Sequence, residues 1–218
     1  MRYTDTLTAP SSEVVNKTLR NTYGLLSLTL LFSAFTAGLS MMMNFAHMNI
    51  FVLLIGFYGL LFLTHKFKNS PFGILCVFAL TGFMGLTLGP ILSAYMQLPG
   101  GGGLIMSALG ITGLSFLGLS GYALVSKKDF SFLNGFLTVG FFVLLFAMVA
   151  GFFVQMPALQ IFISAGFALF SGAVILLQTS QIVRGGETNY ILATVNLYVS
   201  LYNMFLSILS LLGMANDD

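Results

Sequence analysis

The chain has 218 residues, of which 57% are hydrophobic and only 6% are charged, and its mean hydropathy is +0.98. Water-soluble domains are roughly a quarter charged, so this composition excludes a soluble globule and predicts an integral membrane protein. The formal net charge of +2 is small and no basic patch is interleaved with aromatic residues. These features exclude a nucleic-acid-binding protein.

The chain begins with a polar segment. Residues 1–21 contain Pro10 and few side chains that could be buried, so we expect a flexible cytoplasmic tail. The alternative is an amphipathic turn over residues 14–19 that lies on the membrane surface.

Seven apolar stretches follow, each near the roughly 20 residues that a helix needs to cross the hydrocarbon core. They cover residues 22–44, 48–65, 72–96, 102–125, 131–155, 157–181 and 189–214. Their short connections make sequential helices neighbours and leave no room for a separate soluble domain. The predicted fold is therefore all-α, a polytopic membrane protein with a seven-helix transmembrane bundle over residues 22–214.

The positive charges predict the orientation of this bundle. Every Lys and Arg lies before the first stretch or in the connections after the second, fourth and sixth: Arg2, Lys17, Arg20, Lys66, Lys68, Lys127, Lys128 and Arg184. Because positive residues favour the cytoplasmic side, we expect the N-terminus inside and the C-terminus outside.

Small residues recur in several of the stretches. They are Thr29, Ser33, Thr36 and Ser40 in the first, Gly82, Gly85 and Gly89 in the third, and Ser107, Gly110, Gly113, Gly118 and Gly121 in the fourth. Small residues let helix backbones approach closely, and hydroxyl groups bond across helices. Pro90 removes one helix hydrogen bond and predicts a kink in the third stretch.

Two stripes of polar residues follow the last two stretches. The sixth carries Gln160, Ser164, Ser171 and Gln178, and the seventh carries Asn189, Asn196, Ser200, Asn203, Ser207 and Ser210. At 100° per residue, each set stays within roughly 40° of one line along a helix. Lipid offers these groups no hydrogen-bond partner, so they must face protein or water. The stripes are either packing contacts of the bundle or the wall of a polar path between the two helices, which Gln160 and Gln178 favour slightly.

The connection over residues 184–189 is rich in turn signals. Its two glycines permit a positive φ after the sixth helix. Thr188 or Asn189 can cap the next helix, and Glu187 suits the positive end of its dipole. Arg184 and Glu187 could pair across the turn. The connection is either architectural or a cytoplasmic contact site for a partner protein.

Catalytic patterns are weak. Residues 118–121 match the G-x-S-G pattern of intramembrane serine proteases, but Ser120 would need a nearby base. The two histidines, His47 and His65, lie in an outer loop and at the cytoplasmic end of the second stretch. No carboxylate lies at the centre of a stretch, and no His, Cys, Asp and Glu set has metal-ligand spacing. We therefore expect no catalytic residue, no metal, no cofactor and no enzymatic activity.

The chain resembles a known family of membrane proteins. The most specific part is Gly-Gly-Glu-Thr-Asn-Tyr at 185–190, followed by Leu-Tyr at 197–198 and Tyr-Asn at 202–203. Supporting segments are Leu-Arg-Asn-Thr-Tyr at 19–23, Tyr-Gly-Leu at 58–60, Phe-Leu-Thr at 62–64 and Leu-Gly-Pro-Ile-Leu at 88–92. Together they are similar to the Bax inhibitor-1 family, and most similar to a bacterial branch whose members modulate the FtsH protease.

The resemblance implies a seven-helix bundle with the last helix near its centre. It also implies an inner-membrane protein that associates with FtsH and the surrounding HflK and HflC proteins and restrains degradation of membrane proteins. Other family members resemble pH-sensitive calcium leak channels, which makes ion leakage the alternative function. Their pattern uses one carboxylate in each of the last two helices, where this chain has Gln178 and Ser200. A glutamine and a serine cannot titrate, so we expect no channel of that mechanism.

Overall fold

The computed structural model describes residues 12–45, 47–154 and 156–216, so most of the predicted tail lies outside the described residues. Residues 12–21 differ from the expected flexible tail because they form the first turns of α1 (Ser12–Met42). Thr18 in these turns is only 5% exposed, and its hydroxyl donates to the Thr188 carbonyl over 3.3 Å. This contact joins the beginning of α1 to the connection between α6 and α7.

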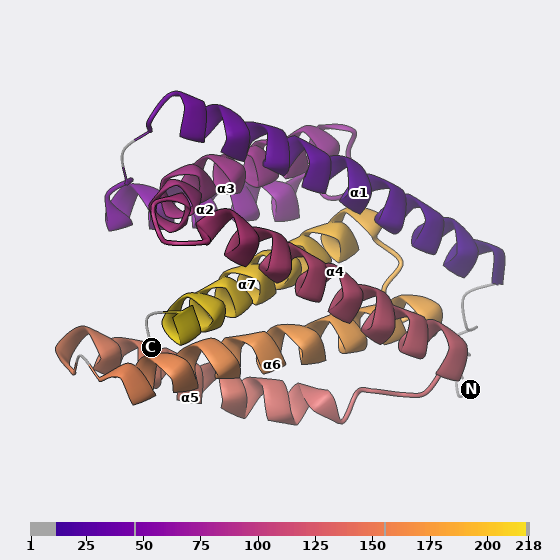
Figure 1. Ribbon diagram of the computed structural model, residues 1–218. Coiled ribbons are helices and arrows are strands. Elements are labelled where there is room, and N and C mark those ends of the chain that lie inside the picture. Colours follow the sequence, from indigo (N-terminus) through magenta and orange to yellow (C-terminus); the bar gives the residue numbers. More distant parts are fainter. Residues whose placement is uncertain (1–11, 46, 155, 217–218) are drawn as a thin grey trace, which may run out of the picture.

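Seven helices and no strand make up the described residues, which confirms the all-α polytopic fold (Figure 1). The helices after α1 are α2 (Ile50–Lys66), α3 (Phe72–Met96), α4 (Gly101–Ser126), α5 (Leu133–Phe153), α6 (Pro157–Val183) and α7 (Tyr190–Asn216). Six of the seven are long and apolar enough to cross a membrane. The exception is α2 with 17 residues. It reaches about 26 Å at 1.5 Å per residue, slightly less than a hydrocarbon core of about 30 Å.

The last helix lies at the centre of the bundle. α7 packs against α1, α2, α3, α4 and α6, and Figure 1 shows it between α1 and α3 on one side and α6 on the other. The main hydrophobic core forms around it, with Leu26, Val77, Leu80, Ile175, Leu197 and Tyr198 among its buried members. This arrangement agrees with the expected central position of the seventh helix.

The other six helices form two groups. α3 packs on both α1 and α2, whereas α6 packs on both α4 and α5. The two groups make little direct contact, which is limited to α3 with α4 and α1 with α6, and α7 packs on helices of both groups. Within the described residues, α5 packs on α6 and on no other helix. The seventh helix therefore joins two three-helix groups.

Glycines of α3 allow α1 to approach closely. A Cβ atom on Gly85 would overlap the Thr36 hydroxyl and the Ser33 carbonyl, and one on Gly89 would overlap the Ser40 side chain. At this contact the Ser40 hydroxyl donates to the Leu86 carbonyl over 2.8 Å. The expected close approach of small residues thus occurs between these two helices.

The glycines of α4 have a different environment. Added Cβ atoms on its middle glycines would meet no atom within 4 Å: Gly110, Gly113, Gly118 and Gly121. These residues therefore do not serve close packing inside the chain, although their spacing resembles that of the α3 glycines. Periodicity locates small residues but cannot show whether another helix covers them.

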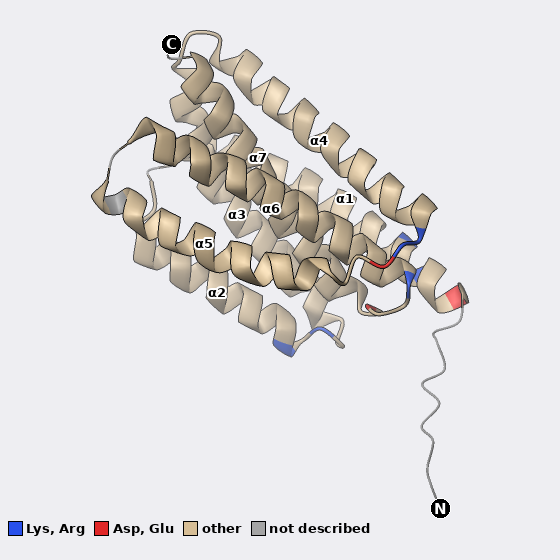
Figure 2. Cartoon of the chain, turned by 90° about the horizontal axis from the view of Figure 1, so that it is seen from below, with Lys and Arg blue, Asp and Glu red and all other residues tan. Residues whose placement is uncertain are grey.

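Charged side chains gather at one end of the bundle. Figure 2 shows the described Lys, Arg, Asp and Glu residues at the end where α1 begins, away from the C-terminal end of α7. The loops that follow α2, α4 and α6 meet at this end, as the sequence pattern predicts. Within the described part of the chain, the opposite end carries no Lys, Arg, Asp or Glu.

Candidate functional site

Two amide side chains meet between α6 and α7. Gln178 comes from the last turns of α6 and is 5% exposed. Asn196, in the second turn of α7, donates from Nδ2 to Gln178 Oε1 over 3.0 Å. The helices run in opposite directions across a short connection, which brings the two positions together. Both side chains are neutral amides. They can form hydrogen bonds, but neither gains or loses a proton as the pH changes.

The Gln178 amide is only partly satisfied. Its Nε2 is buried and has no hydrogen-bond partner among the described residues. A buried donor without a partner costs about 1–3 kcal/mol, so Nε2 offsets part of the stability that the hydrogen bond to Asn196 contributes. Ser200, the other position that matches the carboxylate pair of relatives, donates from its hydroxyl to the Asn196 carbonyl of its own helix over 2.7 Å.

The remaining residues of the two stripes occupy varied environments. Ser171 is 1% exposed, and Ser164 and Ser210 share a hydrogen bond of 3.0 Å across the helices. Asn203 is half-buried, whereas Asn196 is exposed beside the buried Gln178. Gln160 is exposed near the start of α6 and so does not lie in the interior as expected. These residues share one face of their helix, as their angular spacing predicts. Angular spacing does not show how far along the helix a residue lies or which neighbouring helix covers it, so it cannot predict burial.

A second polar cluster surrounds Thr179, which sequence reasoning did not single out. Its hydroxyl lies 3.3 Å from the Tyr23 hydroxyl of α1 and 3.4 Å from the Ser120 hydroxyl of α4. Thr179 is completely buried. It follows Gln178 directly, so the signal was a pair of adjacent polar residues within an apolar helix.

Tyrosines of α7 bind the central helix to its neighbours. The Tyr198 hydroxyl lies 2.6 Å from the Ser33 hydroxyl and donates to the Thr81 carbonyl over 3.2 Å. The Tyr202 hydroxyl lies 2.9 Å from the Thr87 hydroxyl. A buried tyrosine normally needs a partner for its hydroxyl group. The spacing of four residues between the two tyrosines, which places them on one helix face, was the available signal.

The connection between α6 and α7 is held by several hydrogen bonds. Gly185 adopts a φ of 75°, and Glu187 Oε1 accepts from the Asn189 backbone over 2.7 Å. Asn189 Oδ1 accepts from the backbone of Ile191 and Leu192 and so caps α7. Asn189 therefore lies before the helix and does not form part of an interior stripe.

Asn189 also joins this connection to the turn between α2 and α3. Its Nδ2 donates to the Lys68 carbonyl over 3.0 Å and to Asn69 Oδ1 over 2.9 Å. Ser180, near the end of α6, donates to the Lys128 carbonyl over 2.8 Å in the loop between α4 and α5. The short loops at the charged end thus form one connected layer.

Arg184 pairs with Asp129 and not with Glu187 as the sequence suggested. The two side chains are 3.1 Å apart and about half exposed, at 47% and 48%. Two hydrogen bonds from Ser131, and to a smaller extent the Arg184 charge, hold the pKa of the Asp129 carboxyl below its usual range. The cause of the difference is tertiary: the loop after α4 brings Asp129 to Arg184, which the local sequence cannot show.

The described residues show no catalytic arrangement around Ser120. Its hydroxyl contacts Thr179, which is not a base, and His47 and His65 are both exposed. Among the described residues, no group of three or more His, Cys, Asp and Glu side chains could hold a metal ion. The chemistry of the polar interior is therefore that of neutral hydrogen-bonding groups.

Comparison with known proteins agrees with the resemblance in the sequence. Residues 15–217 match the family described as inhibitor of apoptosis-promoting Bax1. The chain is 54% identical to the modulator of FtsH protease YccA of Escherichia coli strain K12 over 203 residues, covering 93% of this chain and 92% of that protein. The same values hold for a protein of E. coli strain CFT073 called inner membrane protein YccA. An uncharacterized Pseudomonas aeruginosa protein is 58% identical over 94% of this chain and 92% of its own length. With the family match spanning nearly all of its helices, the chain belongs to the Bax inhibitor-1 family.

Proposed function

We propose that this chain is an inner-membrane protein that associates with the FtsH protease and restrains its degradation of membrane proteins, without an enzymatic activity of its own. The observation that carries the proposal is the 54% identity, over 93% of the chain, to a protein named modulator of FtsH protease. The family match over residues 15–217 supports it. HflK and HflC are proposed as further members of the same assembly.

The neutral interior supports a regulatory function over ion conduction. A pH-sensitive leak needs a group that titrates inside the membrane. Here Gln178 lies between α6 and α7 and pairs with Asn196, and neither amide can change its charge. Between α6 and α7, the described residues therefore do not provide the carboxylate pair by which relatives would act as pH-sensitive calcium leak channels.

The charged end is the proposed contact surface for the protease. It combines the start of α1, the loops after α2, α4 and α6, and the ion pair between Arg184 and Asp129. The proposed orientation places this end and the N-terminus in the cytoplasm. Residues 1–11 lie outside the described residues, and we propose that this polar terminus is what the protease engages while the bundle resists extraction.

Affinity purification from native membranes tests the association. The full chain with a C-terminal tag should retain FtsH together with HflK and HflC after mild detergent extraction. It should also slow the loss of a membrane substrate of FtsH in cells. Absence of FtsH from the purified material, combined with an unchanged half-life of the substrate, would overturn the proposal.

Two further measurements separate mechanism from function. Deleting residues 2–11 should weaken FtsH retention and restore degradation of the substrate. If both remain at the wild-type level, the tail mechanism is wrong even though the association stands.

Calcium flux into proteoliposomes at pH 6 and pH 8 should match that of protein-free vesicles, and a clear excess would favour the leak channel.

A further inference from the structure

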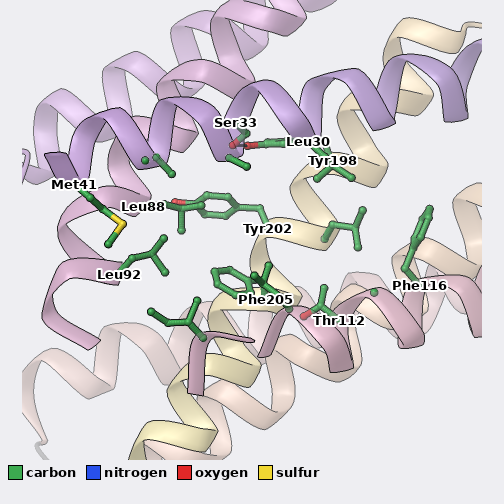
Figure 3. Close-up of a pocket in the computed structure, with 17 residues that line it drawn as sticks. Leu30, Ser33, Met41, Leu88, Leu92, Thr112, Phe116, Tyr198, Tyr202 and Phe205 are labelled. Atoms are coloured by element: carbon green, nitrogen blue, oxygen red, sulfur yellow. Dashed lines mark hydrogen bonds between the residues drawn. The ribbon is translucent and has the colours of Figure 1, made fainter. Parts of the chain in front are cut away.

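A cavity within the membrane-spanning region opens between two helices. It has a volume of about 430 Å³ and is lined by α1, α3, α4 and α7. Figure 3 shows Met41, Leu88 and Leu92 at one end of this space and Phe116 at the other. Small residues of α1 and α4 create the room: Ala34, Ala37, Gly38 and Gly113.

The cavity opens laterally, between α1 and α4, toward the hydrocarbon layer of the membrane. No Cα atom of α1 lies within 8 Å of a Cα atom of α4, so the two backbones leave a gap. Leu30 and Leu109 line the cavity from these two helices and are 37% and 50% exposed, whereas Tyr198 on the central helix is 1% exposed. Toward the charged end, the ring of Phe116 packs on Tyr23 with centroids 5.9 Å apart. The space is therefore a lateral slot whose inner wall is α7.

The hydroxyl groups around the slot already have partners. Tyr198 bonds to Ser33 and to the Thr81 carbonyl, and Thr112 donates to the Ala108 carbonyl over 2.7 Å. The Tyr202 hydroxyl is paired with Thr87. A buried water needs two to four polar partners, and a polar ligand needs free donors or acceptors. Neither is provided, so the slot suits an apolar occupant.

We propose that this slot binds one acyl chain of a membrane phospholipid, which enters from the bilayer between α1 and α4. Acyl chains are the surrounding solvent of this part of the protein. A transmembrane helix from a partner or a second copy is too large. One helical turn with its side chains occupies roughly 400–600 Å³, from a length of 5.4 Å and a width of 10–12 Å. The slot could hold little more than one such turn, whereas a slender chain fits along it.

Photocrosslinking in lipid nanodiscs tests this assignment. The full chain is reconstituted with a phosphatidylethanolamine that carries a diazirine in the middle of one acyl chain, and labelled peptides are identified by mass spectrometry. Label is expected on Tyr198 and Tyr202, on the inner wall of the slot, in addition to Leu117, which is 66% exposed on the surface of α4. Label on Leu117 without label on either tyrosine would overturn the proposal. So would crosslinks from the slot to another protein in place of lipid.

Two filled variants and a matched control complete the test. Gly113 and Gly38 line the slot from opposite sides, and an added Cβ on either meets nothing within 4 Å. Gly113→Leu and Gly38→Leu should each lower the labelling of the two tyrosines by about tenfold, because extra side-chain volume excludes the chain. Gly110→Leu, one turn away on α4 and outside the slot, should leave it unchanged. Labelling of Leu117 should stay constant in all three. Undiminished labelling of the tyrosines in both filled variants would contradict the proposal.

Discussion

At the scale of single residues, the hydrogen bond between Gln178 and Asn196 is the most informative contact of the polar interior. It joins a buried amide on α6 to an exposed one on α7. The Gln178 Nε2 has no partner among the described residues. Its Oε1 accepts the hydrogen bond from Asn196. Loss of that bond leaves the buried amide without a partner.

A double-mutant cycle should reveal this coupling. Gln178→Leu, Asn196→Leu and the double variant should give a coupling free energy of about 0.6–1.7 kcal/mol, the range for hydrogen bonds between membrane helices. The measurement is the free energy of unfolding in mixed micelles. The matched control is a double-mutant cycle of Gln178→Leu with Asn203→Leu. Asn203 lies further along α7 than Asn196, so this cycle should give no coupling free energy. Equal coupling energies in both cycles would contradict a specific pair.

The second residue-scale prediction concerns pH. Asp129 has a pKa below its usual value of 3.8, chiefly because Ser131 donates two hydrogen bonds to it. A lowered folded-state pKa means that the carboxylate stabilises the protein above the usual pKa. That contribution is lost as the pH falls through the lower, folded-state pKa.

Asp129→Asn should therefore lower the unfolding temperature at neutral pH, and its difference from wild type should shrink at strongly acid pH. Arg184→Gln should leave most of this acid dependence in place, because Ser131 makes the larger contribution to the shift. Thermal unfolding scans across the acid range provide the measurement. If the unfolding temperatures of Asp129→Asn and wild type differ by the same amount down to the most acid pH, the Asp129 carboxylate does not stabilise the protein in this way.

At the scale of helices, two glycine series with similar sequence spacing have opposite surroundings. Gly85 in α3 lies against Thr36 and Ser33 of α1, whereas Gly110 in α4 is open. We expect Gly85→Ala to lower the free energy of unfolding by about 1–3 kcal/mol, since the new methyl group forces α1 away.

The matched substitution Gly110→Ala should instead be neutral or raise stability by up to about 1 kcal/mol through helix propensity. Both variants are compared with wild type by unfolding in the same detergent. A loss of stability of the same size at the two positions would show that the contact between α1 and α3 is not specific.

The sequence predicted the helices better than it predicted the site. Hydropathy located all seven, because each segment must satisfy its backbone internally within lipid. Gln178 was identified from its place in a polar stripe with helical spacing. Asn189 was correctly predicted as a possible cap of the last helix. It was wrongly placed in the interior stripe as well, because a residue directly before a helix follows the same angular spacing as those within it. The pair of Arg184 and Asp129 was missed because it depends on two loops meeting, and such contacts leave no local pattern.

At the scale of the whole molecule, charge is separated along the bundle. The described charged residues gather at one end, where the loops after α2, α4 and α6 meet. The separation predicts that the two ends of α4 lie on opposite sides of the membrane, with the end near Lys127 inside.

Cysteine labelling should confirm this orientation. In a chain whose single cysteine, Cys76, is replaced by Ser, Lys127→Cys should react with an impermeant maleimide only in inside-out vesicles. Gln97→Cys, exposed in the turn between α3 and α4, should react only in intact spheroplasts. The reverse pattern of accessibility would mean that the charge rule fails for this protein.

The central position of α7 has a consequence for how the protein is made. The ribosome synthesises α7 after the other six helices, which form the two three-helix groups. Until then, buried side chains of the core such as Val77, Leu80 and Ile175 lack the α7 residues that share their cluster. The core around α7 therefore cannot form until this helix has been inserted beside the other six. A chain truncated before Tyr190 would lack the helix that makes most of the contact between its two halves.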